Sequence, residues 1–274
     1  MTLPSPAACV RLVKLHGLGN DFLVWLTDAG TAASTDVAGL ARKVCDRHRG
    51  IGADGLLVGT PPGPNDGAGA DIVMVLHNAD GSRAEMSGNG VRCFVHAVAR
   101  AGGMTAGTLR VATDAGLREV AFTPDSSGDT DTLHATVDMG PVTAGPAPDT
   151  DAPEPAAGPE ASPQRQATAD IGNPHLVLMV DDPAKVDIGT VGPQWEARYS
   201  HGINVHFVTP SADGAALVVH TWERGAGLTE ACGTGAAAAA AVVHGWGLVG
   251  DDIAVHMPGG DVRVQLNNTV TLIG

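Results

Sequence analysis

Cys232 is placed where the surrounding residues favour reactive chemistry. It lies in Ala231-Cys-Gly-Thr-Gly235, directly before an alanine-rich run that predicts a helix over residues 234–244, with Gly245 as its C-cap. Unpaired N–H groups and the helix dipole at such a helix start favour an anion, either a thiolate or a bound carboxylate. In such a place the pKa of a cysteine falls from about 8.5 to about 3.5–7.5. The alternative is a purely structural cysteine.

The same pattern occurs earlier in the chain. Glu85-Met-Ser87-Gly-Asn-Gly-Val is similar in form to Glu230-Ala-Cys232-Gly-Thr-Gly-Ala, 145 residues later, and each segment opens a helical run. Gly19-Asn20 and Gly172-Asn173 repeat in the same order at 153 residues. Chance matches in a glycine-rich chain are the alternative, but two motifs at similar offsets indicate an internal duplication. Two helix N-termini would then face one cleft and one substrate carboxylate, which suits proton exchange at its α-carbon.

The elements that would position these motifs are mostly short strands. Few helices among many strands, without steady alternation, predict an α+β fold. Turn residues and helical patterns set the expected limits of each element. Strands are expected at 22–26, 56–58, 72–76, 109–112, 177–180, 204–208, 216–221 and 262–266, and helices at 38–46, 90–101 and 234–244.

Charge and composition exclude several classes of protein. The net charge of −14, from 16 Lys and Arg against 30 Asp and Glu, argues against a general binder of nucleic acids or anionic membranes. Neither a signal peptide nor a membrane-spanning run is evident, so a cytoplasmic protein is expected. Cysteine and histidine spacings indicate no metal site and no disulfide framework. The GxGxxG at residues 50–55 follows a polar segment and precedes a strand-like run, which excludes an NAD site.

A proline-rich acidic segment divides the chain. Residues 141–163 contain seven prolines, and residues 124–164 contain eight Asp and Glu but no Lys or Arg. Such a composition predicts a flexible loop at about 141–166, with an acidic docking segment as the alternative. The expected halves are residues 1–130, joined by a C-terminal strand at 265–274, and residues 131–264.

Seven motifs occur in order along the chain and cover nearly all of it except the proline-rich segment. They are His16-Gly-Leu-Gly-Asn20-Asp-Phe22, Asp46-Arg-His-Arg-Gly-Ile-Gly-Ala-Asp54, Asn78-Ala-Asp-Gly-Ser82, Gly88-Asn-Gly-Val-Arg-Cys-Phe94, Gly172-Asn-Pro-His175, Glu223-Arg-Gly-Ala-Gly227 and Ala231-Cys-Gly-Thr-Gly235. Together they resemble the motifs of the diaminopimelate epimerases. The resemblance implies two pseudo-symmetric halves, each a curved sheet wrapped around a central helix, with the active site in the cleft between them, and it implies a homodimer.

The resemblance also implies an activity and a set of site residues. The family interconverts LL- and meso-diaminopimelate, for lysine and peptidoglycan synthesis, without pyridoxal or another cofactor, using two cysteines as an acid–base pair. Cys232 matches one of them, and His175 and Glu223 would help to activate the thiols. The substrate contacts carried over by motif are Gly88, Asn89, Gly233 and Thr234 for the α-carboxylate, Glu223 and Asn78 for the α-ammonium, and Arg224, Asn20, Asn173 and Asn204 for the distal amino-acid end.

Ser87 departs from the family pattern, because the second cysteine belongs at this position. A hydroxyl is a much weaker acid than a thiol and a poor general base without an activating neighbour. Cys93, six residues on, is not placed to substitute. Three interpretations remain open: an engineered Cys→Ser change, a natural member with altered activity, or one-sided chemistry such as dehydration of a hydroxy-amino acid. A binding protein without turnover, or a different amino-acid substrate such as histidine, is a further alternative.

Overall fold

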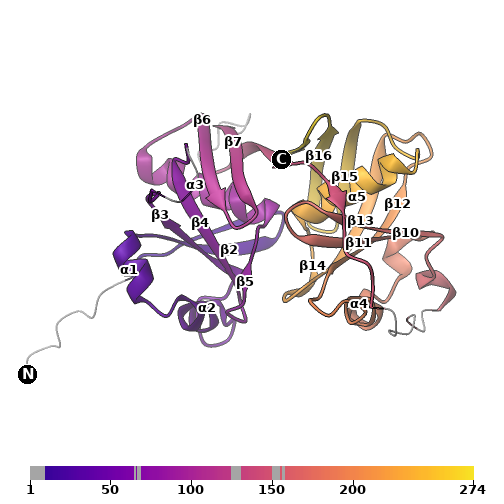
Figure 1. Cartoon of the computed structure of the whole chain (residues 1–274), viewed down its shortest axis with the longest axis horizontal. Coiled ribbons are helices and arrows are strands. Elements are labelled where there is room, and N and C mark those ends of the chain that lie inside the picture. Colours follow the sequence, from indigo (N-terminus) through magenta and orange to yellow (C-terminus); the bar gives the residue numbers. More distant parts are fainter. Residues whose placement is uncertain (1–9, 65, 67–68, 125–130, 150–154, 156–157) are drawn as a thin grey trace, which may run out of the picture.

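The computed structural model describes residues 10–64, 66, 69–124, 131–149, 155 and 158–274. It has two similar halves that lie side by side (Figure 1). The first half consists of β1 (Val13–Gly17), β2 (Asn20–Leu26), α1 (Ala29–Ser34), α2 (Val37–Cys45), β3 (Gly55–Thr60), β4 (Ile72–Asn78), β5 (Arg83–Ala84), α3 (Gly88–Gly102), β6 (Gly107–Thr113), β7 (Gly116–Pro124) and β8 (Leu133–Gly140).

The second half follows the short strand β9 (Thr143–Ala144) and repeats the order of strands and the central helix of the first. Between its second and third strands, a 3₁₀ turn at Pro183–Lys185 stands where the first half has α1, and a further 3₁₀ turn at Pro159–Ala161 precedes the repeat. The repeated elements are β10 (Arg165–Asp170), β11 (Pro174–Met179), α4 (Ile188–Glu196), β12 (Asn204–Pro210), β13 (Ala216–Glu223), β14 (Gly227–Thr229), α5 (Gly233–Gly245), β15 (Asp252–Met257), β16 (Gly260–Leu266) and β17 (Val270–Ile273).

Strand pairing repeats as closely as the element order. In the first half β1–β2 is antiparallel, β2–β3 parallel, β3–β4 antiparallel and β4–β6 parallel. In the second half β10–β11, β11–β12, β12–β13 and β13–β15 have the same directions in the same order. The halves therefore share one topology, as the duplicated motifs predict, and the α+β class expected from the sequence is confirmed.

The two halves join along β8 and β17. These strands pair antiparallel with each other, while β8 also pairs with β7 and β17 with β16, so a single sheet runs through both halves. A second link is the short pairing of β9 with β10. A division of the chain near residue 130, with residues 265–274 returning to the first half, stays a prediction, since β8 and β17 bond to each other at the junction.

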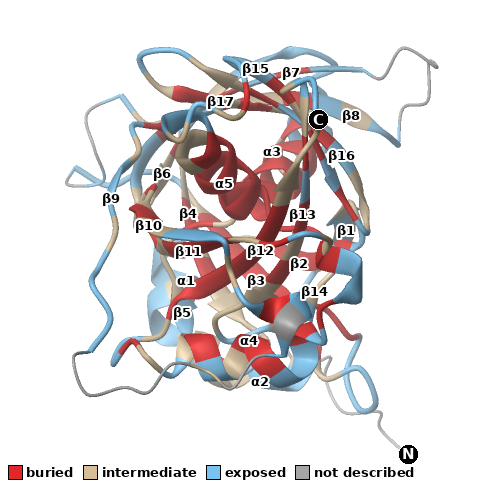
Figure 2. Ribbon diagram, turned by 90° about the vertical axis from the view of Figure 1, so that its right-hand side faces the viewer, coloured by how far each residue is buried: buried red, intermediate tan, exposed pale blue. Residues whose placement is uncertain are grey.

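Each half wraps its sheet around one buried helix, α3 or α5, as Figure 2 shows. All four phenylalanines are buried, and the rest of the core is mainly aliphatic. In α5, residues 236–240 are consecutive alanines with no exposed surface. Such a helix is apolar on every side, which is typical of a helix enclosed by other elements. Small side chains let the surrounding strands approach it closely, and the helix start is thereby held in a fixed position.

Some elements lack a clear sequence signal. The short helix α4 contains Pro193 and two glycines, residues that weaken helical patterns, and it forms because Val191 and Trp195 pack into a core cluster of the second half. The proline-rich segment expected to be a flexible loop contributes β9 near its start and buries Ala161 near its end. Residues 150–154 and 156–157 of this segment lie outside the described residues, as does Cys9.

Candidate active site

Ser87 and Cys232 occupy equivalent positions at the starts of the two central helices. Ser87 is the N-cap of α3, and its Oγ accepts a hydrogen bond from the Gly90 N–H at 3.0 Å. Cys232 is the N-cap of α5, and its Sγ accepts a hydrogen bond from the Gly235 N–H at 3.4 Å. Both caps have extended backbones, as N-caps require. The sequence repeat is therefore a repeat of two side chains in one structural role.

The N-termini of α3 and α5 touch each other. A Cβ added to Gly88 would lie 2.9 Å from the Cα of Gly233, and a Cβ added to Gly233 would lie 2.9 Å from the Cα of Gly88. Only glycine at both positions permits this approach. The positive ends of two helix dipoles and their unpaired N–H groups thus converge, which makes the junction of the halves suited to a carboxylate.

Asn89 links the two halves at this junction. Its side chain is fully buried, and its Nδ2 donates to the carbonyl oxygen of Ala231 at 3.0 Å and to Oδ1 of Asn20 at 3.4 Å. Arg92 Nη2 donates to Asn89 Oδ1 at 2.7 Å, so the amide has a partner at each end. The bond to Ala231 places the first turn of α3 against the residue that precedes Cys232.

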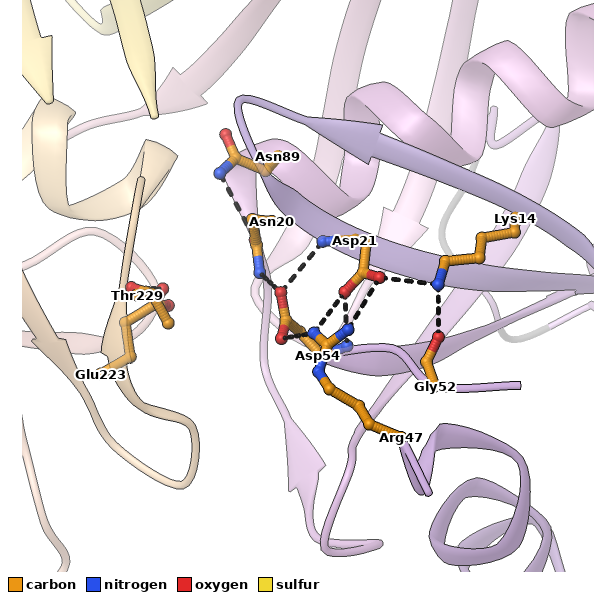
Figure 3. Close-up of polar contacts among 9 residues, drawn as sticks. All are labelled: Lys14, Asn20, Asp21, Arg47, Gly52, Asp54, Asn89, Glu223 and Thr229. Atoms are coloured by element: carbon orange, nitrogen blue, oxygen red, sulfur yellow. Dashed lines mark hydrogen bonds and ion pairs between the residues drawn. The ribbon is translucent and has the colours of Figure 1, made fainter. Parts of the chain in front are cut away.

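A charged network holds Asn20 in place (Figure 3). Asn20 Nδ2 donates to Asp54 Oδ2 at 2.7 Å, and Arg47 Nη2 bridges Asp54 and Asp21 at 2.6 and 2.7 Å. Burial alone would raise the pKa of Asp21, but hydrogen bonds from Arg47 and Lys14 outweigh it and lower the pKa to about 2. The Asp21 carboxylate therefore stays ionised, and the network anchors the turn before β2.

A cavity of about 400 Å³ lies between the halves. Of the site residues predicted from the sequence, seven line it: Asn20, Asn78, Ser87, Asn173, Asn204, Glu223 and Arg224. The others are buried and do not line it: Gly88, Asn89, His175, Cys232, Gly233 and Thr234. Ser87 thus lies at the cavity wall, whereas Cys232 is buried at the cap of α5 and is not part of that wall.

Cys232 is almost completely buried, with 3% of its surface exposed. Burial raises the pKa of its thiol well above the usual value, and the nearby charge of Glu223 raises it further. Hydrogen bonds with Thr234 and the Gly235 N–H act in the opposite direction but are weaker. A lowered pKa, expected from the helix start, is therefore wrong for Cys232, because desolvation outweighs the field of the helix.

Glu223 is the ionisable neighbour of this thiol. Burial raises the pKa of Glu223, while hydrogen bonds from Thr229 and with Cys232 lower it in part. Thr229 Oγ1 donates to Glu223 Oε1 at 2.6 Å, and Figure 3 shows this pair facing Asn20 and Asn89 across the cleft. A carboxyl group whose pKa is raised toward neutrality, next to a thiol, is a suitable acceptor for the thiol proton.

Among the described residues, the hydrogen bonds of His175 go to Asn173 and His206 and to neither helix cap. Its Nε2 bonds to Asn173 Oδ1 at 2.9 Å, and its Nδ1 bonds to His206 Nε2 at 2.8 Å. Because an amide oxygen only accepts, His175 Nε2 carries the proton and its Nδ1 accepts from His206. His206 Nδ1 in turn bonds to Thr221 Oγ1 at 3.0 Å. Participation of His175 in thiol activation stays a prediction.

The other end of this chain of hydrogen bonds reaches Cys232, the N-cap of α5. Asn173 Nδ2 donates to Thr234 Oγ1 at 3.5 Å, and Thr234 Oγ1 lies 3.5 Å from Cys232 Sγ. His206 also packs against the first turn of α5, where a Cβ on Gly235 would lie 2.1 Å from its ring. Sequence reasoning missed His206 as part of the site, because its role depends on the pairing of β11, β12 and β13.

Among the described residues, no group of three or more His, Cys, Asp or Glu side chains is placed to hold a metal ion.

Both buried histidines make folding sensitive to acid. Burial lowers the pKa of His206 to about 3 and that of His175 well below 6.5. Below pH 6.5 the unfolded chain binds protons that the folded chain rejects. The free energy of unfolding should therefore fall with decreasing pH, by up to about 1.4 kcal/mol per pH unit for each such histidine. Chemical denaturation between pH 7 and 4.5 measures this slope.

Replacing His206 with asparagine should reduce the slope, whatever it does to stability at neutral pH. The matched control is His134→Asn, which makes the same substitution at an exposed position on β8. An unaltered slope in the His206 variant would contradict a neutral, proton-excluding His175–His206 pair.

Comparison with known proteins identifies relatives of the chain. A family model described as "Diaminopimelate epimerase" matches residues 12–144 and 167–272. The chain is 34% identical to the diaminopimelate epimerase of Geobacillus thermodenitrificans over 92% of this chain and 87% of the relative. It is 36% identical to that of Methanothermobacter thermautotrophicus over 95% of this chain and 92% of the relative. The unmatched interval falls on the proline-rich segment.

Solved structures agree on the fold. A hydroxyproline epimerase from Agrobacterium vitis superposes with a TM-score of 0.70 at 19% identity, covering 96% of this chain and 88% of that one. A protein described as a predicted epimerase from Pseudomonas aeruginosa gives 0.72 at 16% identity, covering 97% and 95%. The matched family model and the curated relatives, together with one candidate acid–base group at each central helix, define an isomerase of the epimerase class. The chain belongs to the diaminopimelate epimerase family. In the described part of the chain, none of the helices is both long and apolar enough to cross a membrane.

Proposed function

We propose that the chain epimerises LL-diaminopimelate to the meso form without a cofactor, at a rate limited by Ser87. The observation that carries the proposal is the meeting of α3 and α5, which brings two helix N-termini and two cap side chains to one cleft. The names of its relatives support the substrate. On the same family basis we place the enzyme in lysine and peptidoglycan synthesis, in the cytoplasm, as a homodimer.

Cys232 is the base in this proposal. Glu223 takes the thiol proton, and the thiolate then removes the α-proton of the substrate. The electron pair left on the α-carbon is delocalised into the carboxylate. Backbone N–H groups of Gly88, Asn89, Gly233 and Thr234 stabilise the resulting negative charge, since the two helix starts point toward it. Asn173 and Thr234 keep the thiol oriented, and His175 acts through them as a positioning residue.

Ser87 limits the second half of the reaction. Reprotonation on the opposite face needs an acid at the cap of α3, and a serine hydroxyl releases its proton far less readily than a thiol. Among the described residues, only the Gly90 N–H is hydrogen-bonded to Ser87 Oγ, and this donor does not activate the hydroxyl as an acid–base group. The carbanion is therefore returned mainly to the starting isomer by Cys232.

One-sided chemistry is the second candidate, and the serine at the α3 cap is the observation that favours it. Loss of water from a hydroxylated amino acid needs one base and one hydrogen-bonding group on the leaving hydroxyl, roles that fit Cys232 and Ser87. The set of Asn78, Asn204 and Arg224 at the cavity wall favours a longer substrate with a second charged end, so we place this candidate second.

Incubation with LL-diaminopimelate in D2O tests the proposal. Deuterium should enter the α-position faster than stereoinversion occurs, by about 100-fold or more, because only Cys232 is an effective acid–base group. Mass spectrometry measures the exchange, and chiral chromatography separates the isomers. A complete absence of exchange would favour a binding protein. Exchange with a hydroxy-amino acid accompanied by a keto-acid product would favour the dehydratase.

A further inference from the structure

Glu85 and Arg224 form an ion pair across the active-site cleft. Arg224 Nη2 lies 2.6 Å from Glu85 Oε2, and the two residues come from opposite halves. Of the described ion pairs, this is the one with both members in the wall of the 400 Å³ cavity. The side chains are 25% and 40% exposed, so each can exchange its partner without leaving water completely. The sequence motifs single out Arg224 but assign Glu85 no role.

The pair stands between two cavities. Glu85 and Arg224 line the cleft and also a neighbouring cavity of about 370 Å³ beside Tyr199 and His201. Arg224 is held from behind, because its Nη1 donates to the His201 carbonyl oxygen at 3.4 Å and its backbone N–H donates to Asn204 Oδ1 at 3.1 Å. The guanidinium is thus fixed at the end of the cleft, and there is room on both sides of its carboxylate partner.

The internal repeat shows that this pair is specific to one side of the cleft. Glu230 is the counterpart of Glu85 and also reaches the opposite half, where a Cβ on Gly19 would lie 2.3 Å from Glu230 Oε2. No ion pair of Glu230 is present among the described residues, whereas Glu85 meets a guanidinium. The duplication therefore accounts for a glutamate at both positions but not for the Glu85–Arg224 pair, which makes the two ends of the cleft chemically different.

We propose that Glu85 is a specificity-determining residue that exchanges Arg224 for the distal ammonium of the substrate, while Arg224 takes the distal carboxylate. The inference rests on the proposed function and adds the requirement for a zwitterionic far end. The one ion pair between Glu85 and Arg224 is replaced by two ion pairs with the substrate, so no charge is left unpaired in the cleft. The other carboxylates of this wall are engaged by neighbouring groups of the protein: Asp54 by Asn20 and Arg47, Asp80 by Ser82, Glu196 by Trp222, and Glu223 by Thr229 and Cys232. Glu85 is therefore the better counter-ion for a second ammonium.

Three ligands distinguish a substrate that pairs with both Glu85 and Arg224 from a ligand that pairs with only one of them. Diaminopimelate carries both distal charges, L-2-aminopimelate carries the distal carboxylate alone, and L-lysine carries the distal ammonium alone. A distal carboxylate without an ammonium must displace Glu85 and leave it unpaired. Lysine can bind Glu85 only by leaving Arg224 unpaired. The wild-type chain should therefore bind diaminopimelate most tightly of the three.

Isothermal titration calorimetry of the wild type and Glu85→Gln with these ligands tests the inference. The substitution should weaken diaminopimelate binding by about tenfold, which is typical of losing one charged hydrogen bond. It should strengthen 2-aminopimelate binding, because the competitor for Arg224 is gone. Glu85→Asp should recover part of the preference. Glu119→Gln is the matched control, since Glu119 is exposed on β7 and its loss changes the net charge equally.

The outcomes distinguish the inference from the proposed function. Equal shifts for diaminopimelate and 2-aminopimelate would show that Glu85 only ties the halves together, and would overturn the inference alone. Unchanged affinities would do the same. If none of the three ligands binds to the wild-type chain, and no α-exchange occurs in D2O, the proposed function is overturned as well.

Discussion

Ser87→Cys is expected to raise the rate of stereoinversion of LL-diaminopimelate by about 10²- to 10⁴-fold, the usual contribution of a positioned acid–base group. A thiol at this position can release a proton to the carbanion, and its thiolate can act as base in the reverse direction. Deuterium exchange at the α-carbon should change much less, because Cys232 already performs it. Chiral chromatography of the products against time in D2O measures both rates on one sample.

The fold should accept Ser87→Cys, since a cysteine already caps the equivalent helix α5. Cys232 occupies the equivalent cap of α5 with its sulfur bonded to the N–H three residues on, as Ser87 bonds to Gly90. Ser34→Cys, at an exposed position at the end of α1, is the control for adding a thiol elsewhere. If Ser87→Cys folds, binds the substrate and still inverts it no faster, the limiting role assigned to the serine is wrong.

Cys232→Ala should abolish α-proton exchange, with a loss of about 10³-fold or more. Cys232 is the N-cap of α5, and Glu223 next to it accepts its proton in the proposed reaction. The other described cysteines cannot substitute, because Cys45 and Cys93 are buried and burial raises the pKa of their thiols to about 11 and about 12. Deuterium incorporation followed by mass spectrometry measures the loss.

A structural effect of this substitution has to be separated from a chemical one. Alanine removes the acceptor for the Gly235 N–H and should cost about 1 kcal/mol of helix stability. Cys232→Ser keeps an acceptor at the cap but replaces the thiol with a weak acid, so it should restore thermal stability without restoring exchange. Exchange retained by the alanine variant would exclude Cys232 as the base.

Local patterns predicted much of this protein. Alternating and aliphatic runs between turn residues located β2, β3, β4, β6, β11, β12, β13 and β16, and the glycine-rich starts located α3 and α5. These signals depend only on residues that are close in the chain, so the sequence alone is enough to recognise them. Elements such as α4 and β9 were missed because long-range packing and pairing hold them, and propensity does not.

The repeat of Ser87 and Cys232 at the heads of two helices followed from residue types and spacing alone, and so did the family resemblance. The thiol's ionisation state, the Glu85–Arg224 pair and the His175–His206–Thr221 chain did not. Each depends on groups brought together from distant parts of the chain, and on burial that only the closed sheet produces. A helix start favours a thiolate wherever it occurs, but the cost of desolvation is set by what packs around it. The sequence therefore predicts which side chains meet the substrate, while the packing of the two halves decides the charge of the Cys232 thiol.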